Sequence, residues 1–335
     1  MPMIPGLILP YTSDQMISPR RDAMKLGFAL PHVGPVATRE NITATALEAE
    51  ALGYDSLWTL DRLLKPKDPK TPYPGSPDGE LDEQYHTVYE HLSVLTYVAA
   101  ITSRLRLGVS VVNLPFYNPV LLAKRIATMD QLSGGRVSLG VGLGWSEDEA
   151  DVTNTPYKER GRIGEEAVLA LKALWSDDPV EFQGRYFTVP PSVFGPKPLQ
   201  KPHPPLLMGA FAPVALRRAG RLADGFTGCC VSVDLLLDFR AQFEEAAAEA
   251  GRDPAALPTV IRCLVKLTPN PVDDQARPVA VGSWEQVRDD IQRLEEAGVD
   301  EVFFDVSFQP DNTDRGALLG YLERFRGILE EPVPA

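Results

Sequence analysis

Cysteine and histidine are scarce in this 335-residue chain. Its three cysteines, Cys229, Cys230 and Cys263, are too few for a disulfide framework, and the adjacent pair lacks the spacing of a CxxC redox or zinc site. We expect all three to be small buried residues of a protein kept in a reducing cytoplasm. The four histidines form no HExxH motif or other close pair of ligands, so the sequence predicts no dedicated metal site.

Positive charge and long apolar runs are also in short supply. The chain has 33 Lys and Arg against 46 Asp and Glu, a formal net charge of -13, which disfavours nucleic acid and anionic membranes as partners. No apolar run approaches the ~20 residues that a membrane-spanning helix needs. The apolar stretch near the start lacks a cleavage site, and we interpret residues 1–23 as a loose extension rather than a secretory signal. The expected partner is a small molecule.

The most informative segment is 136–149, RVSLGVGLGWSEDE. Branched aliphatic residues occupy alternate positions, which is the period of a β-strand. The opposite face carries Ser138 and the glycines Gly140, Gly142 and Gly144. A strand face without side chains leaves room either for a flat, bulky ligand or for close packing of neighbouring backbone.

Strands and helices alternate along the rest of the chain. We expect eight strands at 25–31, 56–60, 105–113, 137–143, 206–210, 225–230, 259–268 and 299–307, with a helix after each. Strict alternation indicates a parallel sheet, and eight such units predict an α/β fold of the (β/α)8 TIM-barrel type. An open, doubly wound sheet is the alternative. Its GxGxxG fingerprint fails, because the last glycine would fall at Trp145.

Two insertions interrupt this alternation within a single domain over residues 24–335. Residues 61–85 are rich in Pro, Gly, Lys and Asp, and a loop of this length is typical of a lid over a binding site. Residues 178–205 contain an expected hairpin around Gln183 and Gly184, followed by a proline-rich connector.

In a TIM barrel the ligand binds at the carboxyl ends of the strands. The polar and small residues at those ends are His32, Asp61, Arg62, Ser110 to Asn113, Gly144, Trp145, Gly209 to Ala212 and Ser307 to Gln309. No Ser-His-Asp order or close carboxylate pair stands out among them, which favours a cofactor that brings its own chemistry. Asp61 could equally serve as a cap or ion-pair residue, and His32 as a polar loop residue.

The segment from Gly209 through Ala210, Phe211 and Ala212 joins a strand end to a helix that starts at Pro213. Free N–H groups and the positive end of the helix predict an anion site there, with a plain turn as the alternative.

Several long segments resemble one known family. They include ALGYDSLWTLDR, YVAAITSRLRLGVSV, NPVLLAKRIATMDQLSGGRVSLGVGLGW, KPHPPLLMGAFAPVALRRAGRLADGF and GSWEQV. In these segments the chain resembles the luciferase-like flavin and deazaflavin oxidoreductases, and in particular the branch that uses coenzyme F420. The resemblance implies a TIM barrel, a homodimer and a cofactor lying across the carboxyl ends of the strands.

The resemblance also implies roles for individual residues. It places a cis peptide bond behind the cofactor ring, at Ser110–Val111, and assigns the cofactor phosphate to Gly209, Ala210, Phe211 and Ala212. Asp61 matches an aspartate near the deazaflavin ring, and Gly144 belongs to the same cofactor site.

Two positions depart from the family pattern. Arg62 stands where the family often has histidine, and we expect it to stabilise negative charge on the ring. Trp145 replaces the glutamate of the branch that oxidises a sugar phosphate, so that substrate is not carried over. We expect Asp61, Arg62 and Trp145 to shape the reacting side, and His32 and Trp145 to contact substrate.

The predicted activity is hydride transfer between C5 of coenzyme F420 and a small organic substrate. An FMN-dependent monooxygenase supplied with reduced flavin is the first alternative. A non-catalytic barrel that binds flavin or deazaflavin is the second. A phosphosugar enzyme without a redox cofactor is a third, and it lacks recognisable acid–base pairs.

Overall fold

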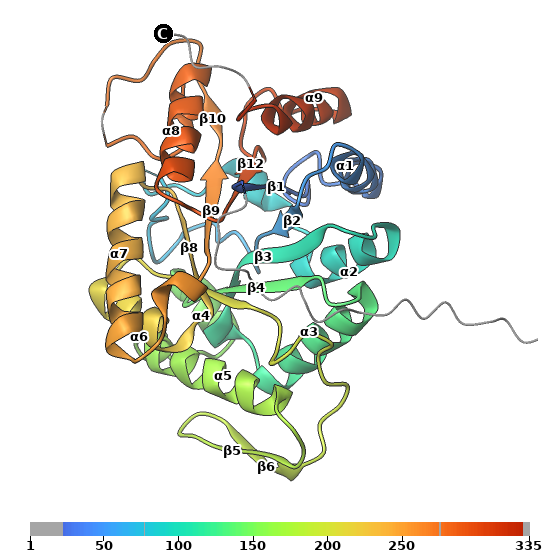
Figure 1. The fold of residues 1–335 in the computed structure, drawn as a ribbon, viewed down its shortest axis with the longest axis vertical. Helices are drawn as coiled ribbons and strands as arrows, with labels where there is room; N and C mark the ends of the chain where they lie inside the picture. The colour runs from blue at the N-terminus through green and yellow to red at the C-terminus, as the bar shows by residue number, and fades with distance from the viewer. Residues whose placement is uncertain (1–22, 77, 275, 331–335) are drawn as a thin grey trace, which may run out of the picture.

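The computed structural model describes residues 23–76, 78–274 and 276–330, and its centre is a closed barrel of parallel strands (Figure 1). The strand order around the barrel is β1-β12-β9-β8-β7-β4-β3-β2. These strands are β1 (Lys25–Ala29), β2 (Ser56–Thr59), β3 (Arg106–Asn113), β4 (Val137–Gly142), β7 (Leu206–Gly209), β8 (Gly225–Cys229), β9 (Thr259–Leu264) and β12 (Glu301–Asp305). The predicted TIM barrel is confirmed.

Helices surround the barrel and follow its strands in the chain (Figure 1). They are α1 (Arg39–Ala51), α2 (His91–Ile101), α3 (Pro119–Ser133), α4 (Glu147–Val152), α5 (Arg160–Trp175), α6 (Pro213–Leu222), α7 (Val233–Glu249), α8 (Trp284–Glu296) and α9 (Arg315–Arg326). Among the described residues, no helix is both long enough and apolar enough to cross a bilayer.

The described residues also contain two small sheets and four short 3-10 helices. The predicted hairpin forms from β5 (Val180–Gln183) and β6 (Thr188–Ser192), and a parallel pair joins β10 (Lys266–Leu267) to β11 (Val281–Gly282). The 3-10 helices are η1 (Glu83–His86), η2 (Leu114–Phe116), η3 (Tyr157–Glu159) and η4 (Pro254–Ala256).

Side-chain caps mark where several of the helices begin. Thr38 caps α1, Asn118 caps α3 ahead of Pro119, and Ser283 forms a capping box with Gln286 at α8. At α7 the cap is Ser232, whose side chain accepts from the Leu235 amide.

Two local elements differ from the sequence-based expectation. The acidic stretch after Trp145, expected as a turn, forms α4 because Ser146 caps it and three carboxylates in its first turn favour the positive helix end. The strand expected over 259–268 is interrupted at Val265, so its last residues form β10 outside the barrel.

The lumen of the barrel is filled by its own side chains. Trp58 stacks on Phe303 with ring centroids 4.8 Å apart. A Cβ atom on Gly108 would lie 2.3 Å from the Trp58 ring, so glycine is required where the indole meets β3. This layer also contains Ala29, Leu207 and Val260. A ligand therefore has no space inside the barrel and must bind above it.

The glycine face of β4 packs against protein rather than leaving a slot. A Cβ on Gly140 would meet the Val109 carbonyl oxygen at 2.3 Å, and one on Gly142 would meet Val111 at 2.6 Å. Gly144 has φ +71° and lies against the Phe116 ring. Of the two alternatives for this strand, close backbone packing is the one that the structure adopts at these positions.

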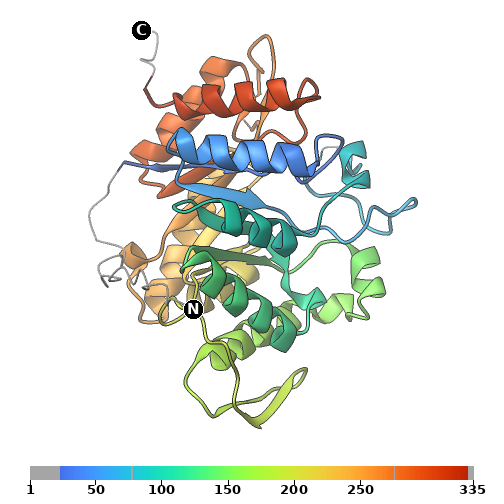
Figure 2. The same cartoon turned by 90° about the vertical axis from the view of Figure 1, so that its right-hand side faces the viewer.

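The two insertions lie at different places on the barrel. The lid segment (residues 61–85), light blue in Figure 2, lies on the same side of the barrel as the green α4, whereas the β5–β6 hairpin lies beyond α5. The expected loose extension, residues 1–23, lies almost entirely outside the described residues.

Candidate functional site

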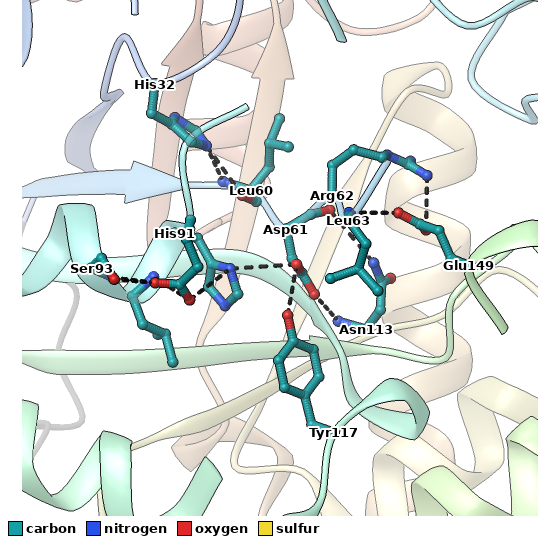
Figure 3. Close-up of polar contacts among 12 residues, drawn as sticks. His32, Leu60, Asp61, Arg62, Leu63, His91, Ser93, Asn113, Tyr117 and Glu149 are labelled. Carbon is teal, nitrogen blue, oxygen red and sulfur yellow. Dashed lines mark hydrogen bonds and ion pairs between the residues drawn. The ribbon is translucent and has the colours of Figure 1, made fainter. Parts of the chain in front are cut away.

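Asp61 organises the strand ends on one side of the barrel mouth (Figure 3). Its carboxylate accepts hydrogen bonds from the Asn113 amide at 3.0 Å and from the Tyr117 hydroxyl at 2.8 Å, and His91 Nδ1 lies 3.4 Å away. The group is buried, and each of its oxygens has a partner. In this position Asp61 fixes the end of β3 and the turn into α3.

Burial also affects the partners of Asp61. It is the main cause that lowers the pKa of His91 and raises that of Tyr117. His91 therefore stays neutral at pH 7, and its Nε2 atom is buried without a partner among the described residues.

The peptide bond between Ser110 and Val111 is cis, as the resemblance implies. Here the register of β3 against β4 shifts between Val109 and Val112. The Val111 side chain lies between the glycines of two neighbouring strands. A Cβ on Gly209 of β7 would be 3.6 Å from Val111 Cγ1. The mouth at β3, β4 and β7 is therefore lined by backbone and one valine.

The loop after β7 ends in an uncapped helix. Ala212 is the N-cap residue of α6 and has an extended backbone, but its side chain cannot accept a hydrogen bond. No acceptor in the described part of the chain takes the amides of Phe211, Ala212 or Val214. Ala210 is buried, whereas Phe211 is 51% exposed and meets Phe239 edge-on. These amides lie where the sequence predicts an anion site.

Arg62 turns away from Asp61 and pairs with Glu149 of α4 (Figure 3). Their charged atoms are 2.9 Å apart, and the side chains are 6% and 1% exposed. Glu149 also accepts the Leu63 amide at 2.7 Å. Burial raises the pKa of Glu149, and the guanidinium opposes this effect. Arg62 Nε is buried without a partner among the described residues, so the paired guanidinium still has one free donor.

Aromatic rings cover Arg62 and the mouth beside it. Tyr73 lies 5.2 Å from Trp145 and 6.2 Å from Tyr85, and Tyr85 lies 4.8 Å from Phe308, all between ring centroids. The Arg62 guanidinium carbon is 4.8 Å from the Trp145 ring and 5.4 Å from the Tyr85 ring. We call Tyr73, Tyr85, Trp145 and Phe308 the aromatic roof.

Polar contacts fasten the lid segment to α4. The Lys70 amide donates to Asp148 at 3.0 Å, its ammonium group pairs with Asp151, and the Glu147 amide donates to Thr71 at 3.0 Å. The lid also closes on itself through Lys65 and Glu83, 2.6 Å apart. The position of the lid thus depends on the helix that carries Glu149.

His32 is engaged by backbone on both ring nitrogens. Nδ1 lies 2.8 Å from the Leu30 carbonyl oxygen, and Nε2 accepts the Leu60 amide at 3.0 Å (Figure 3). The ring is buried, which lowers its pKa, so His32 is neutral with its proton on Nδ1. This arrangement joins the loops after β1 and β2. With 1% of its surface exposed and both ring nitrogens engaged, His32 positions these loops and offers almost no surface for the predicted substrate contact.

The other side of the mouth holds a buried ion pair that the sequence-based analysis missed. Arg262 of β9 donates to Asp305 of β12 from Nε at 3.0 Å and from a terminal nitrogen at 2.5 Å. Next to it, at the end of β8, Cys229 and Cys230 are partly exposed, so the expectation that all three cysteines are buried holds only for Cys263. The described residues contain no cluster of three metal-ligating side chains.

The missed residues left different signals in the sequence. Arg262 interrupts an otherwise apolar strand, and a buried arginine requires a carboxylate. Glu149 belongs to the acidic stretch after Trp145. Tyr73 and Tyr85 lie in the lid, where sequence patterns give no side-chain direction.

Comparison with known proteins gives one family. The profile of the family described as luciferase-like monooxygenase matches residues 24–277. The uncharacterized protein Rv0953c of Mycobacterium tuberculosis is 32% identical over 326 residues, 97% of this chain and 98% of that protein.

Two further relatives match about half of their own length. The F420-dependent glucose-6-phosphate dehydrogenase of Amycolatopsis mediterranei is 34% identical over 185 residues, 54% of this chain and 50% of that protein. The FMNH(2)-dependent dimethylsulfone monooxygenase of Pseudomonas putida is 30% identical over 180 residues, 53% of this chain and 48% of that protein.

Solved structures agree on the fold. An F420-dependent secondary alcohol dehydrogenase in complex with an F420-acetone adduct has a TM-score of 0.73 at 21% identity, covering 92% of this chain and 98% of that one. The monooxygenase RslO1 from Streptomyces bottropensis has a TM-score of 0.71 at 20% identity, covering 92% and 99%.

Proposed function

Because the chain belongs to the luciferase-like monooxygenase family, we propose that it is an oxidoreductase that uses coenzyme F420 to transfer hydride to or from a small organic substrate. The observation that carries this proposal is the set of unpartnered amides at Phe211, Ala212 and Val214, beside a part of the mouth lined by backbone. A phosphate-bearing cofactor with a flat ring fits that combination.

The residues present fit such a cofactor. The loop from Gly209 to Ala212 would bind its phosphate, and Ser110 and Val111 would lie behind its ring, with Gly144 nearby. When bound, the deazaflavin supplies the hydride chemistry at its C5 atom. Asp61 acts as a positioning residue, because its carboxylate holds Asn113 and Tyr117 and so fixes the strand that carries Ser110 and Val111.

The substrate would enter beneath the aromatic roof. The four rings of the roof would exclude water from the mouth, and they offer apolar surfaces rather than charged groups. The Arg62 guanidinium lies beneath the Trp145 and Tyr85 rings, so its positive charge would favour an oxygen of the cofactor or substrate at this part of the mouth. These features favour an apolar substrate with one polar group, which Trp145 would contact.

The choice of cofactor rests on the relatives. The family includes an F420-dependent dehydrogenase and an FMNH(2)-dependent monooxygenase, which are 34% and 30% identical over similar lengths. The latter makes an FMN-dependent monooxygenase the second candidate. We also propose that the protein forms a homodimer, which light scattering on the purified chain tests directly.

Cofactor binding tests the proposal. The purified protein is titrated separately with coenzyme F420, FMN and reduced FMN, and Trp fluorescence and the melting temperature are recorded. We expect coenzyme F420 to quench fluorescence from Trp145 and to raise the melting temperature more than either flavin. Stronger binding of FMN would replace this proposal by the second candidate, and no binding of any of them would refute both. Turnover with a panel of alcohols, enones and imines then identifies the substrate class.

A further inference from the structure

Two adjacent thiols lie at the mouth of the barrel, and neither belongs to the proposed cofactor or substrate site. Cys229 is the last residue of β8, and Cys230 follows with φ +62°, in the left-handed region that side chains rarely adopt. Both are partly exposed, whereas Cys263 is buried. Each of the two thiols is the neighbour with the largest effect on the pKa of the other.

The barrel register places a cation beside this pair. Cys229 pairs with Arg262 across β8 and β9, so both side chains point to the same face. Asp305 holds the Arg262 guanidinium at 2.5 Å. The next strand, β7, pairs Gly209 with Thr227, so the thiols are on the same rim as the proposed phosphate loop.

These contacts make the two thiols chemically unequal. The adjacent Cys230 thiol lowers the pKa of Cys229 to about 7, with a smaller contribution from Arg262 and against the effect of burial. The pKa of Cys230 is raised by Cys229 and by burial. Cys229 is therefore the thiol of the pair that loses its proton more readily, and Cys230 is the one that keeps it.

We propose that Cys229 and Cys230 form a redox site that hydrogen peroxide converts reversibly into a disulfide between adjacent residues. The Cys229 thiolate attacks one peroxide oxygen, the O–O bond breaks, and the products are a Cys229 sulfenic acid and hydroxide, which is protonated to water. The Cys230 sulfur then attacks the sulfenic sulfur and loses its proton, and water leaves. In total two thiols lose two electrons, and peroxide is reduced to two molecules of water. A dithiol reductant restores both thiols.

The arrangement matches what such a site needs. Redox-sensitive cysteines combine a low thiol pKa and solvent access with a second cysteine close enough to resolve the sulfenic acid. Cys263 provides a contrast in the same chain, because it is buried in the core and burial raises the pKa of its thiol. The site does not depend on the identity of the cofactor.

Thiol mapping of the full chain tests the proposal. The reduced protein is treated with hydrogen peroxide at pH 7, denatured, alkylated with N-ethylmaleimide and analysed by mass spectrometry of the intact chain and of its peptides. We expect the chain to lose the mass of two hydrogen atoms, alkylation at Cys263 alone, and recovery of all three sites after dithiothreitol. Alkylation of all three cysteines after peroxide, or disulfides that involve Cys263 or join two chains, would overturn the proposal.

Variants separate the roles of the two thiols. In Cys263→Ala the same disulfide should form. In Cys230→Ala, peroxide should leave a Cys229 sulfenic acid that dimedone traps, and the pH midpoint for alkylation of Cys229 should rise from about 7. An unchanged midpoint in Cys230→Ala would contradict the role of the Cys230 thiol, and the mapping of the unmodified chain stands whether or not a variant folds.

Discussion

Ala212 at the start of α6 offers a substitution whose effects on stability and on cofactor binding should have opposite signs. Its backbone is already extended, with φ -99° and ψ 145°, and its methyl side chain caps nothing. An aspartate at this position can accept a hydrogen bond from the free Val214 amide. The same carboxylate would occupy the anion site and repel a phosphate.

The two effects can be estimated separately. Replacing alanine by aspartate at an N-cap stabilises a protein by about 1 kcal/mol, which raises the melting temperature of a chain of this size by about 2 °C. A carboxylate about 4 Å from a phosphate charge costs about 1 kcal/mol in water and about 4 kcal/mol at an effective dielectric constant near 20. Since about 1.4 kcal/mol is a factor of ten, Ala212→Asp should weaken cofactor binding by between about fivefold and several hundredfold.

Ala212→Asn is the matched control, because asparagine caps a helix about as well as aspartate without the charge. Urea unfolding of the free protein and fluorescence titration with coenzyme F420 measure the two properties. We expect both variants to gain stability and only Ala212→Asp to lose most of its affinity, with a smaller loss at high salt. If Ala212→Asp is stabilised yet binds the cofactor as tightly as the unmodified protein, the phosphate does not bind at this helix end and the reasoning is refuted.

Three further predictions concern the barrel and its mouth. Glu149→Gln leaves the buried Arg62 charge uncompensated and should lower the free energy of unfolding, measured by urea titration, by about 3–5 kcal/mol. Replacing both residues by apolar ones should recover much of this loss. Equal losses in the single and the double variant would contradict a buried ion pair. Burial lowers the pKa of His32 below 6.5, so the contribution of this residue to stability is complete above pH 6.5 and is lost as the pH falls from 6.5 towards the folded-state pKa. In His32→Asn the free energy of unfolding should therefore depend less steeply on pH in this range. An unchanged slope would exclude His32 as the source of the pH dependence. Gly108→Ala drives a methyl group into Trp58 and should cost about 1–3 kcal/mol, whereas Gly320→Ala in α9, where nothing lies within 4 Å, should stabilise the protein by about 0.5–1 kcal/mol; similar effects at both glycines would show that the lumen is not tightly packed.

The sequence predicts the barrel well because its signals are local and repeated. Alternating aliphatic residues, capping residues and glycine stops mark each strand–helix unit within about thirty residues. What occupies the empty face of a strand cannot be predicted from such local signals. Gly140 and Gly142 leave the same gap whether a ligand or a neighbouring backbone fills it, and the groups that fill it, Val109 and Val111, belong to another strand.

The contacts of the site residues were harder to predict the farther away in the sequence their partners lie. Asp61 and Arg62 stand out as charges at a strand end, but their partners Tyr117 and Glu149 are 56 and 87 residues away. Adjacent in sequence, they belong to separate networks, one that fixes β3 and one that fixes the lid. Arg262 is an exception, because a charge inside an apolar strand requires a carboxylate, and barrel order places β12, with Asp305 at its end, beside β9.

The barrel mouth has two chemically different sides, and the filled lumen confines any ligand to the space above them. Trp58 and Phe303 close the interior, so any ligand must lie between the strand ends and the lid. At β3, β4 and β7 this space is bounded by backbone, whereas at β8, β9 and β12 it is bounded by thiols and by the Arg262–Asp305 pair.

The aromatic roof belongs to neither part of the mouth. Three of its rings come from the lid or from the loop after β12, and the fourth, Trp145, immediately precedes the helix to which the lid is fastened. Substitutions in the lid can therefore reshape the substrate space without disturbing the backbone that would receive the cofactor. Changes at Glu149 cannot do so, because this carboxylate holds both Arg62 and the Leu63 amide, next to the residue that fixes the end of β3.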